Sequence, residues 1–352
     1  MHDITGMTRP GLVQWFEKQG MRSFRAGQVF KWIYIKQAET FGEMTDISKD
    51  VRQILSDNFT IPRLRLEASR FSADGTEKLL FGLRDGNRIE SVLIPQKDHF
   101  TLCISSQAGC AQGCRFCLTA KCGLKRSLTT SEIVAQVRDA RRHLETRGTC
   151  TSSGLPAGPL SNIVFMGMGE PLANFDAVMD AIETITDSDF GLKFSPRRVT
   201  LSTCGLVPEI KRLDKHTDVN LAISLNATDD ATRSMLMPVN RLYPIAELLE
   251  ACRDFRLKPR SKITFEYILI KDINDGDQDA KKLVKLLSPL KAKVNIIPFN
   301  EHELSDFKRP SPERVSRFVQ ILLDRRMTAI IRKSKGDDIC AACGQLQAEM
   351  LE

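Results

Sequence analysis

The sequence predicts an α/β protein: a partial, open (β/α)6-type barrel with a small N-terminal accessory domain of helices and β-hairpins. From about residue 102 onward, short β-branched apolar runs alternate with helix-like segments. This alternation implies parallel strands covered by helices. It yields six or seven βα units, fewer than the eight of a closed barrel. A doubly wound sheet is the alternative arrangement of the same units.

The 352-residue chain has a composition typical of globular proteins, with 42% hydrophobic and 27% charged residues. It contains no run of about 18 apolar residues, and its first residues lack the features of a signal peptide. We therefore expect a cytoplasmic protein with no membrane partner. In that reducing compartment, ten cysteines indicate metal binding or catalysis rather than disulfides. The net charge of +7 is compatible with a polyanionic partner, although solvated charges explain most such excesses.

The first sixty residues predict short helices, because apolar residues recur there at helical spacing. Arg22, Arg25 and Lys31 stand near Trp32 in this part of the chain. Two interpretations remain open and are compatible with each other. One is a basic module that grips nucleic acid, and the other is a packed helical hairpin with solvated charges.

Residues 62–95 predict a small antiparallel sheet, with tight turns at Asp74-Gly75 and Asp85-Gly86. Glu90 lies in its last strand and by itself is an ordinary polar strand residue. We divide the chain into an accessory domain (1–95), the barrel (96–335) and a C-terminal tail (336–352).

Seven apolar runs predict the strands of the barrel: 102–106, 163–166, 199–202, 221–224, 263–270, 294–297 and 329–332. Thr129 and Glu132 form a capping box that predicts the start of the first helix. Residues 146–160 are rich in Gly, Pro and Ser and predict a surface loop.

One stretch, residues 101–117 (TLCISSQAGCAQGCRFC), holds four of the cysteines. Cys110, Cys114 and Cys117 have C-x3-C-x2-C spacing, and neighbouring glycines free the backbone to curl. Thiolates so close together suit one soft metal centre. Because a 4Fe-4S cluster normally takes four cysteines, three would leave one iron open.

A structural zinc site is the alternative for these cysteines. Cys114 and Cys117 would pair with the second C-x2-C, Cys340 and Cys343. Zinc ribbons keep such pairs close in the sequence, whereas most of the barrel separates these two. The zinc site also leaves Cys110 unexplained. The remaining cysteines, 122, 150, 204 and 252, are most simply small hydrophobes or surface thiols.

Several polar or small residues follow the ends of predicted strands: residues 167–170, Ser202, residues 224–226 and Asn300. The carboxyl ends of parallel strands carry the active site in barrels and in doubly wound sheets. The glycines before Glu170 allow a ligand to approach the backbone, and the carboxylate suits an ammonium group. A turn with a solvated glutamate is the simpler alternative.

Six segments resemble, in order along residues 88–347, the radical S-adenosylmethionine (SAM) superfamily and its RNA-methylating RlmN/Cfr branch. They are TLCISSQAGCAQGCRFC, FMGMGEPLAN, SPRRVTLSTCGLVP, RLYPI, KVNIIPFN and GDDICAACGQL. KVNIIPFN and GMGEPL are more similar to members that methylate C2 of adenine than to those that methylate C8.

The resemblance implies a radical SAM barrel whose 4Fe-4S cluster is held by Cys110, Cys114 and Cys117. SAM would chelate the open iron, and an electron from the cluster would split it into methionine and a 5′-deoxyadenosyl radical. Two SAM molecules would be used per turnover. Matching positions imply that seven residues hold SAM: Gly169, Glu170, Ser202, Ser224, Leu225, Asn226 and Asn300.

The resemblance also implies the catalytic residues. Cys343 matches the cysteine that carries the methyl group, and Cys103 matches the one that forms a transient disulfide with it to release the product. Glu90 matches a base that removes the C2 proton, a role for which Cys103 is also a candidate. The implied partners are 23S ribosomal RNA, transfer RNA, an electron donor and a thiol reductant, with a monomeric enzyme.

Two departures from the family pattern stand out. Residues 224–227 read Ser-Leu-Asn-Ala where Ser-Leu-His-Ala is expected, so Asn226 offers no imidazole. Cys340 is an additional cysteine, either a competing disulfide partner or a spectator. Two rival functions remain: C8 methylation of the same adenine, and a non-catalytic RNA-binding protein with a zinc ribbon.

Overall fold

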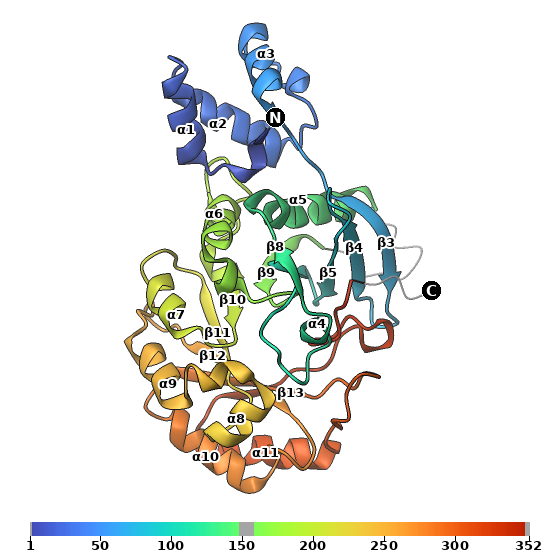
Figure 1. Cartoon of the computed structure of the whole chain (residues 1–352), viewed down its shortest axis with the longest axis vertical. Helices are drawn as coiled ribbons and strands as arrows, with labels where there is room; N and C mark the ends of the chain where they lie inside the picture. Colours follow the sequence, from blue (N-terminus) through green and yellow to red (C-terminus); the bar gives the residue numbers. More distant parts are fainter. Residues whose placement is uncertain (1, 148–157, 349–352) are drawn as a thin grey trace.

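The computed structural model describes residues 2–147 and 158–348 (Figure 1). Most of the connector predicted for residues 146–160, including Cys150, lies outside the described residues. Within the described ranges, no helix is long and apolar enough to cross a membrane.

A ten-stranded sheet forms the centre of the molecule, in the order β14-β13-β12-β11-β10-β9-β6-β5-β4-β3. Seven neighbouring strands run parallel. They are β6 (Phe100–Cys103), β9 (Leu160–Phe165), β10 (Val199–Thr203), β11 (Asn220–Ser224), β12 (Ile263–Leu269), β13 (Ala292–Pro298) and β14 (Ala329–Ile331). Each of the seven predicted strands is therefore confirmed, with ends that differ by a few residues.

The parallel strands follow one another in chain order, and the sheet has two free ends. A doubly wound sheet would reverse its strand order at a switch point, so this alternative is wrong. Six crossovers carry the helices α5 (Thr130–Thr146), α6 (Phe175–Thr186), α7 (Val207–Leu213), α9 (Ile245–Asp254), α10 (Asp277–Leu287) and α11 (Pro312–Asp324). They lie along the outside of the sheet (Figure 1). The open barrel is therefore confirmed.

Helix α5 begins at the predicted capping box. The Glu132 N–H donates to Thr129 Oγ1 over 3.2 Å, and the Thr129 N–H donates to Glu132 Oε2 over 2.9 Å. These bonds satisfy two backbone donors that the first helical turn leaves without partners.

A helical unit precedes the sheet and lies beyond α5 and α6 in Figure 1. It contains α1 (Arg9–Lys18), α2 (Phe24–Phe30), a π-helical turn (Lys31–Ile35) and α3 (Lys49–Asn58). A buried bond of 2.7 Å between the Thr5 and Ser131 hydroxyls joins the unit to α5. Trp32 is held within the unit, because its indole N–H donates to Asp46 and Lys36 lies over its ring.

The predicted hairpins are β3 (Arg65–Phe71), β4 (Glu77–Gly82) and β5 (Arg88–Pro95). Strand β5 also pairs with β6, where Val92 faces Cys103. The hairpins therefore extend the barrel sheet, and the boundary expected near residue 95 falls inside one continuous sheet. Local patterns predict strands but not which distant edge they join.

Candidate active site

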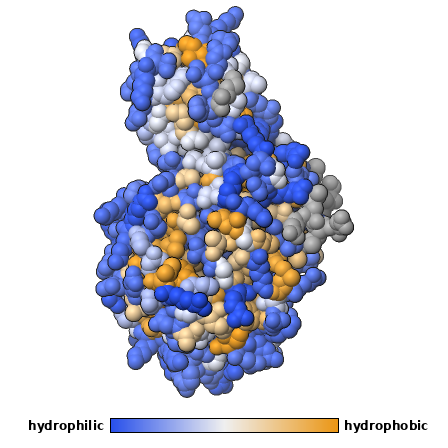
Figure 2. All heavy atoms as spheres, in the orientation of Figure 1, coloured by the Kyte–Doolittle hydropathy of each residue, from blue (hydrophilic) through white to orange (hydrophobic). Residues whose placement is uncertain are grey.

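A cavity of about 390 Å³ lies at the carboxyl ends of the parallel strands. Eleven of the thirteen predicted site residues line it: Cys103, Cys110, Cys114, Cys117, Gly169, Glu170, Ser202, Ser224, Asn226, Asn300 and Cys343. Figure 2 shows apolar residues gathered over this part of the barrel and hydrophilic residues around it. The tertiary structure therefore brings together residues that are up to 240 positions apart (343 − 103).

The cysteine loop starts with a tight backbone crossing. The Cys110 N–H donates to the Gly123 carbonyl over 3.0 Å. Gly109, with φ +82°, runs so close to this carbonyl that a Cβ would lie 1.9 Å from its oxygen. Only glycine fits at this position. The crossing turns the chain so that Cys110, Cys114 and Cys117 face the cavity.

Burial raises the pKa of all three cluster-loop thiols, that of Cys110 to about 11. Neighbouring thiols add to the shift at Cys114. Free thiols would therefore be protonated at neutral pH, whereas bound iron replaces their protons and keeps them as thiolates. Three buried or half-buried thiols on one loop suit an iron–sulfur cluster with one open iron.

The single-ion alternative has less support from the geometry. Among residues 2–147 and 158–348, no three His, Cys, Asp or Glu side chains converge closely enough to hold one metal ion. A 4Fe-4S cluster spreads its cysteine ligands over different iron atoms. The loop thus fits a cluster better than a single zinc ion.

Glu170 is buried, with both carboxylate oxygens held by the backbone. The Leu172 N–H donates to Oε1 over 3.0 Å, and the Cys204 N–H donates to Oε2 over 2.8 Å. Burial raises the pKa of this carboxyl group despite these bonds. Each oxygen keeps a lone pair for a ligand, so Glu170 is a fixed acceptor at the cavity wall.

Gly169, the residue before Glu170, has φ +97°, and a Cβ at this position would lie 2.5 Å from the Gln107 Cβ. The close approach of strand end and cysteine loop therefore requires glycine.

Asn226 has a structural role at the edge of the cavity. Its φ of +57° is left-handed, a conformation that asparagine tolerates better than most residues. Its Oδ1 accepts the Ile268 N–H over 2.8 Å, and its carbonyl accepts from Asn274 over 2.7 Å. The side chain thus links β11 to β12 while lining the cavity.

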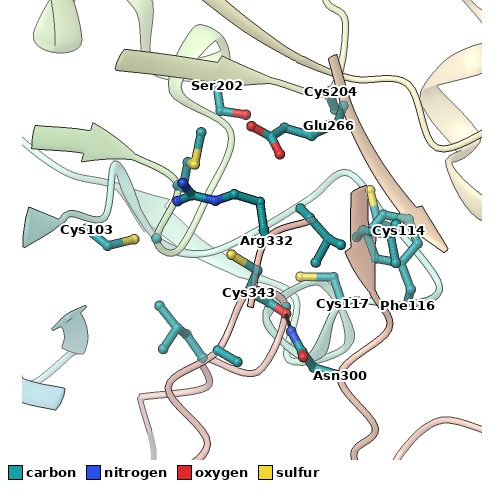
Figure 3. Close-up of a pocket in the computed structure, with 18 of the residues that line it drawn as sticks. Cys103, Cys114, Phe116, Cys117, Ser202, Cys204, Glu266, Asn300, Arg332 and Cys343 are labelled. Carbon is teal, nitrogen blue, oxygen red and sulfur yellow. Dashed lines mark hydrogen bonds between the residues drawn. The ribbon is translucent and has the colours of Figure 1, made fainter. Parts of the chain in front are cut away.

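Cys343 projects into the cavity from the C-terminal tail, and Cys103 lies on β6 (Figure 3). Asn300 donates to the Cys343 carbonyl over 3.1 Å and so fixes the tail here. Cys343 is exposed as a residue, but the surrounding cavity wall desolvates its thiol and raises the pKa to about 11; nearby Glu266 raises it further and Arg332 lowers it. Burial also raises the Cys103 pKa strongly, and Cys343 adds to this shift.

Sequence reasoning missed three groups of the cavity wall: Glu266, Arg332 and Cys204. Glu266 accepts from the Asn295 amide over 2.8 Å, and burial raises its pKa while Arg332 lowers it. Glu266 lies within the predicted strand 263–270, and Arg332 ends the predicted strand 329–332. A charged residue in an otherwise apolar strand was the feature of the sequence that could have indicated them. Cys204, interpreted as a small hydrophobe or surface thiol, is buried beside the cluster loop, where its thiol contacts Gln112 Oε1 at 3.5 Å.

Arg233 does not line the cavity but binds the backbone of residues at its wall. It is fully buried and donates to the carbonyls of Cys204 over 2.7 Å and Leu225 over 3.1 Å. It therefore ties together the ends of β10 and β11.

Two of the predicted site residues do not line the cavity. The Leu225 side chain is buried in the core, and its carbonyl is one of those that Arg233 holds. Glu90 is also buried and forms an ion pair of 3.0 Å with Lys78.

Comparisons with known proteins cover the helical unit and the barrel. The family model described as the ribosomal RNA large subunit methyltransferase N-terminal domain matches residues 2–61, and that of the radical SAM superfamily matches residues 104–284. The Dual-specificity RNA methyltransferase RlmN of Desulfosudis oleivorans is 55% identical over 348 residues, 99% of this chain and 91% of that protein. Its counterpart in Geobacter sulfurreducens is 50% identical over 350 residues, 99% of this chain and 93% of that protein.

A solved structure is similar over the same span. The radical SAM methyltransferase from Sphaerobacter thermophilus matches with a TM-score of 0.90 and 42% identity, covering 99% of this chain and 100% of that chain. The similarity thus includes the arrangement of the helical unit on the barrel.

Proposed function

Since the chain belongs to the RlmN family of radical SAM RNA methyltransferases, we propose that it methylates C2 of adenine 2503 in 23S ribosomal RNA and of adenine 37 in some transfer RNAs. The observation that carries the proposal is that Cys343 and Cys103 line the same cavity as the three cluster-loop cysteines. A methyl carrier, its resolving thiol and the cofactor site are then within one enclosure.

The residues of the cavity divide the binding roles. Cys110, Cys114 and Cys117 hold the 4Fe-4S cluster, and Glu170 holds the amino group of SAM. Ser202, Ser224 and Asn300 contribute further polar atoms to the wall that faces SAM. When bound, the cluster would supply the electron that cleaves SAM. The 5′-deoxyadenosyl radical so formed would take a hydrogen atom from the methyl group carried by Cys343, and the resulting methylene would add to C2 of adenine.

Cys343 solves a problem of polarity. C2 of adenine lies between two ring nitrogens and is electrophilic, and so is the methyl group of SAM. A direct polar transfer therefore has no nucleophile. The Cys343 thiolate is a nucleophile, so it takes the methyl group of a first SAM and holds it beside the cavity in which a second SAM is cleaved.

Cys103 completes the cycle. Once the methylene on Cys343 is bonded to C2 of adenine, the Cys103 thiolate attacks the Cys343 sulfur. The S–CH2 bond breaks, the methylene carbon leaves with the electron pair and takes up a proton to become the methyl group, and a Cys103–Cys343 disulfide remains. A thiol reductant then opens this disulfide by exchange. Glu90 remains the proposed base for the C2 proton by resemblance, with Cys103 as the alternative.

Nucleoside analysis tests the proposal. The protein is reconstituted with iron and sulfide without oxygen, reduced, and incubated with SAM and unmodified 23S ribosomal RNA or transfer RNA in separate reactions. We expect 2-methyladenosine in the RNA digest. Finding 8-methyladenosine instead would favour the C8 reaction. A reconstituted protein without the brown colour of an iron–sulfur cluster would favour the zinc-ribbon alternative.

A further inference from the structure

Lys78 and Glu90 form a buried ion pair beside the C-terminal tail. Their side chains are 6% and 1% exposed, and Lys78 Nζ lies 3.0 Å from Glu90 Oε1. In the register of β4 and β5, Lys78 faces Val92, two residues from Glu90. The two side chains are therefore diagonal neighbours on one face of the sheet.

The same two side chains bind the backbone of the tail at two points. Lys78 Nζ donates to the Cys340 carbonyl over 3.3 Å, and the Gln347 N–H donates to Glu90 Oε2 over 3.0 Å. Cys343 lies between these points, three residues after the first and four before the second. Figure 1 shows the tail beside β4.

The polar groups of this pair are not explained by stability alone. Well-packed apolar residues often replace a buried ion pair at no loss of stability. Apolar side chains, however, offer no donor for the Cys340 carbonyl and no acceptor for the Gln347 N–H. What the pair adds is therefore a defined placement of the tail on the sheet.

Further contacts to the tail come from α4 (Leu118–Lys121), the short helix that directly follows the cysteine loop. The Leu118 N–H donates to the Gly344 carbonyl over 2.7 Å, and Thr119 Oγ1 donates to the Leu346 carbonyl over 2.5 Å. The turn that carries Cys343 thus contacts both α4 and the β4–β5 face, and Asn300 binds the Cys343 carbonyl. Release of the β4–β5 side would remove one of the anchors that set the position of the thiol.

We propose that Lys78 and Glu90 are positioning residues for Cys343: the pair clamps the tail on both sides of the carrier cysteine and sets where its sulfur stands in the cavity. The catalytic effect of the clamp rests on the proposed function, in which Cys343 carries the methyl group. The placement of the tail by the clamp does not depend on that function. The proposal gives Lys78 a role in positioning the tail. It gives Glu90 the same role, in addition to its proposed role as the base for the C2 proton. Because a misplacement of about 1 Å costs on the order of 100-fold in rate, loss of the clamp will slow the chemistry at Cys343.

The first test is structural and needs neither SAM nor RNA. In Lys78→Met/Glu90→Leu, apolar residues replace the pair, and the thermal midpoint is expected to stay near that of the parent protein. Hydrogen exchange by mass spectrometry is expected to become about tenfold faster in residues 340–348. The matched control is Arg88→Met, which removes an ion pair of 2.7 Å with Glu67 on the same sheet and is expected to leave exchange in the tail unchanged.

The second test separates positioning from base catalysis. The first step transfers the methyl carbon of SAM to the Cys343 sulfur, with S-adenosylhomocysteine leaving and the thiol proton passing to solvent. It occurs before any proton leaves the RNA, so loss of a base alone would not slow it. We expect Lys78→Met to slow methylation of Cys343 about 100-fold, followed by the peptide mass, and to lower kcat while KM for SAM and the visible cluster absorbance stay unchanged.

The outcomes are distinct. Unchanged exchange in residues 340–348 of the double variant, or of the uncharged Lys78→Met/Glu90→Gln if that variant does not fold, overturns the clamp. Faster exchange with an unchanged rate of Cys343 methylation overturns the positioning role. If the parent protein produces no methylated RNA, the proposed function fails, whereas the exchange result still decides whether the clamp exists.

Discussion

Six cysteines line the cavity, and the proposed function gives roles to all of them except Cys204. They are Cys103, Cys110, Cys114, Cys117, Cys204 and Cys343. Three belong to the loop that follows β6, where Gly109 permits the tight crossing. Cys103 stands on β6 before this loop, in register with Val92 of β5. Its backbone is thus fixed by the sheet, independently of the loop geometry.

Substitution of Cys103 is therefore expected to separate catalysis from cluster binding. Cys103→Ala should retain the brown chromophore but lose more than about 1,000-fold in RNA methylation, because no thiol resolves the Cys343 adduct. Cys110→Ala should lose both. Cys204→Ala serves as the control within the same cavity and should keep both. A colourless Cys103→Ala protein would place Cys103 among the cluster ligands.

Asn226 shows how a residue that differs from the family pattern is integrated. Asn226→Ala leaves the Ile268 N–H without its acceptor and places a less tolerant residue at positive φ. We expect a loss of about 1–3 kcal/mol in the free energy of unfolding, visible as a lower thermal midpoint in the protein without cofactors. The same substitution at half-buried Asn87, which lies in a hairpin turn, provides the comparison. An unchanged midpoint in Asn226→Ala would show that the bond to β12 contributes little.

At the scale of elements, a buried carboxylate joins β4 to the end of α5. Glu77 on β4 is fully buried and lies 2.7 Å from His143 Nε2, with Arg147 as a second partner. Burial raises the Glu77 pKa, but bonds from His143 and Ser69 and the charge of Arg147 outweigh it, so the net pKa is below its ordinary value. The ionised form is therefore favoured by folding.

The lowered pKa of Glu77 predicts that the protein loses stability in acid. The folded-state pKa lies below the unfolded value of about 4.5, so the contribution is complete above that pH. It is lost as the pH falls through the folded-state pKa. Thermal midpoints measured at decreasing pH should fall more steeply for the parent protein than for Glu77→Gln. Parallel curves would mean that other carboxylates dominate acid unfolding.

The elements differ in how far their sequence predicts them. The parallel strands carry apolar runs long enough to identify, and Thr129 marks the start of α5 by a local signal. The pairing of β5 with β6 has no such signal, because it depends on which edge remains open once the barrel has formed. For that reason the sequence alone places the hairpins in the N-terminal domain.

At the scale of the whole molecule, the proposed turnover requires Cys103 on the first parallel strand of the barrel, the cysteine loop that follows it, and Cys343 in the C-terminal tail. If Cys103 resolves Cys343, omission of a thiol reductant should stop the reaction after about one methylated adenine per protein, since each turnover consumes both thiols. Mass spectrometry should then find the Cys103–Cys343 disulfide, and added dithiothreitol should restore turnover. Multiple turnovers without a thiol reductant, with the cluster reduced by a non-thiol donor, would contradict the disulfide step.

The sequence alone determined the class of the protein. The strand alternation, the C-x3-C-x2-C spacing and the ordered motifs are local features that can be recognised without a three-dimensional structure. It also predicted eleven of the residues that line the cavity, some from the family resemblance and others because residues at the carboxyl ends of parallel strands meet at one edge. The tertiary structure decided three further matters: that Glu90 lies outside the cavity, that Glu266 and Arg332 lie within it, and that Lys78 and Glu90 hold the tail around Cys343. Each of these is a contact between segments far apart in the chain. Such contacts depend on how the complete sheet and tail pack, and a local pattern reports only period and propensity.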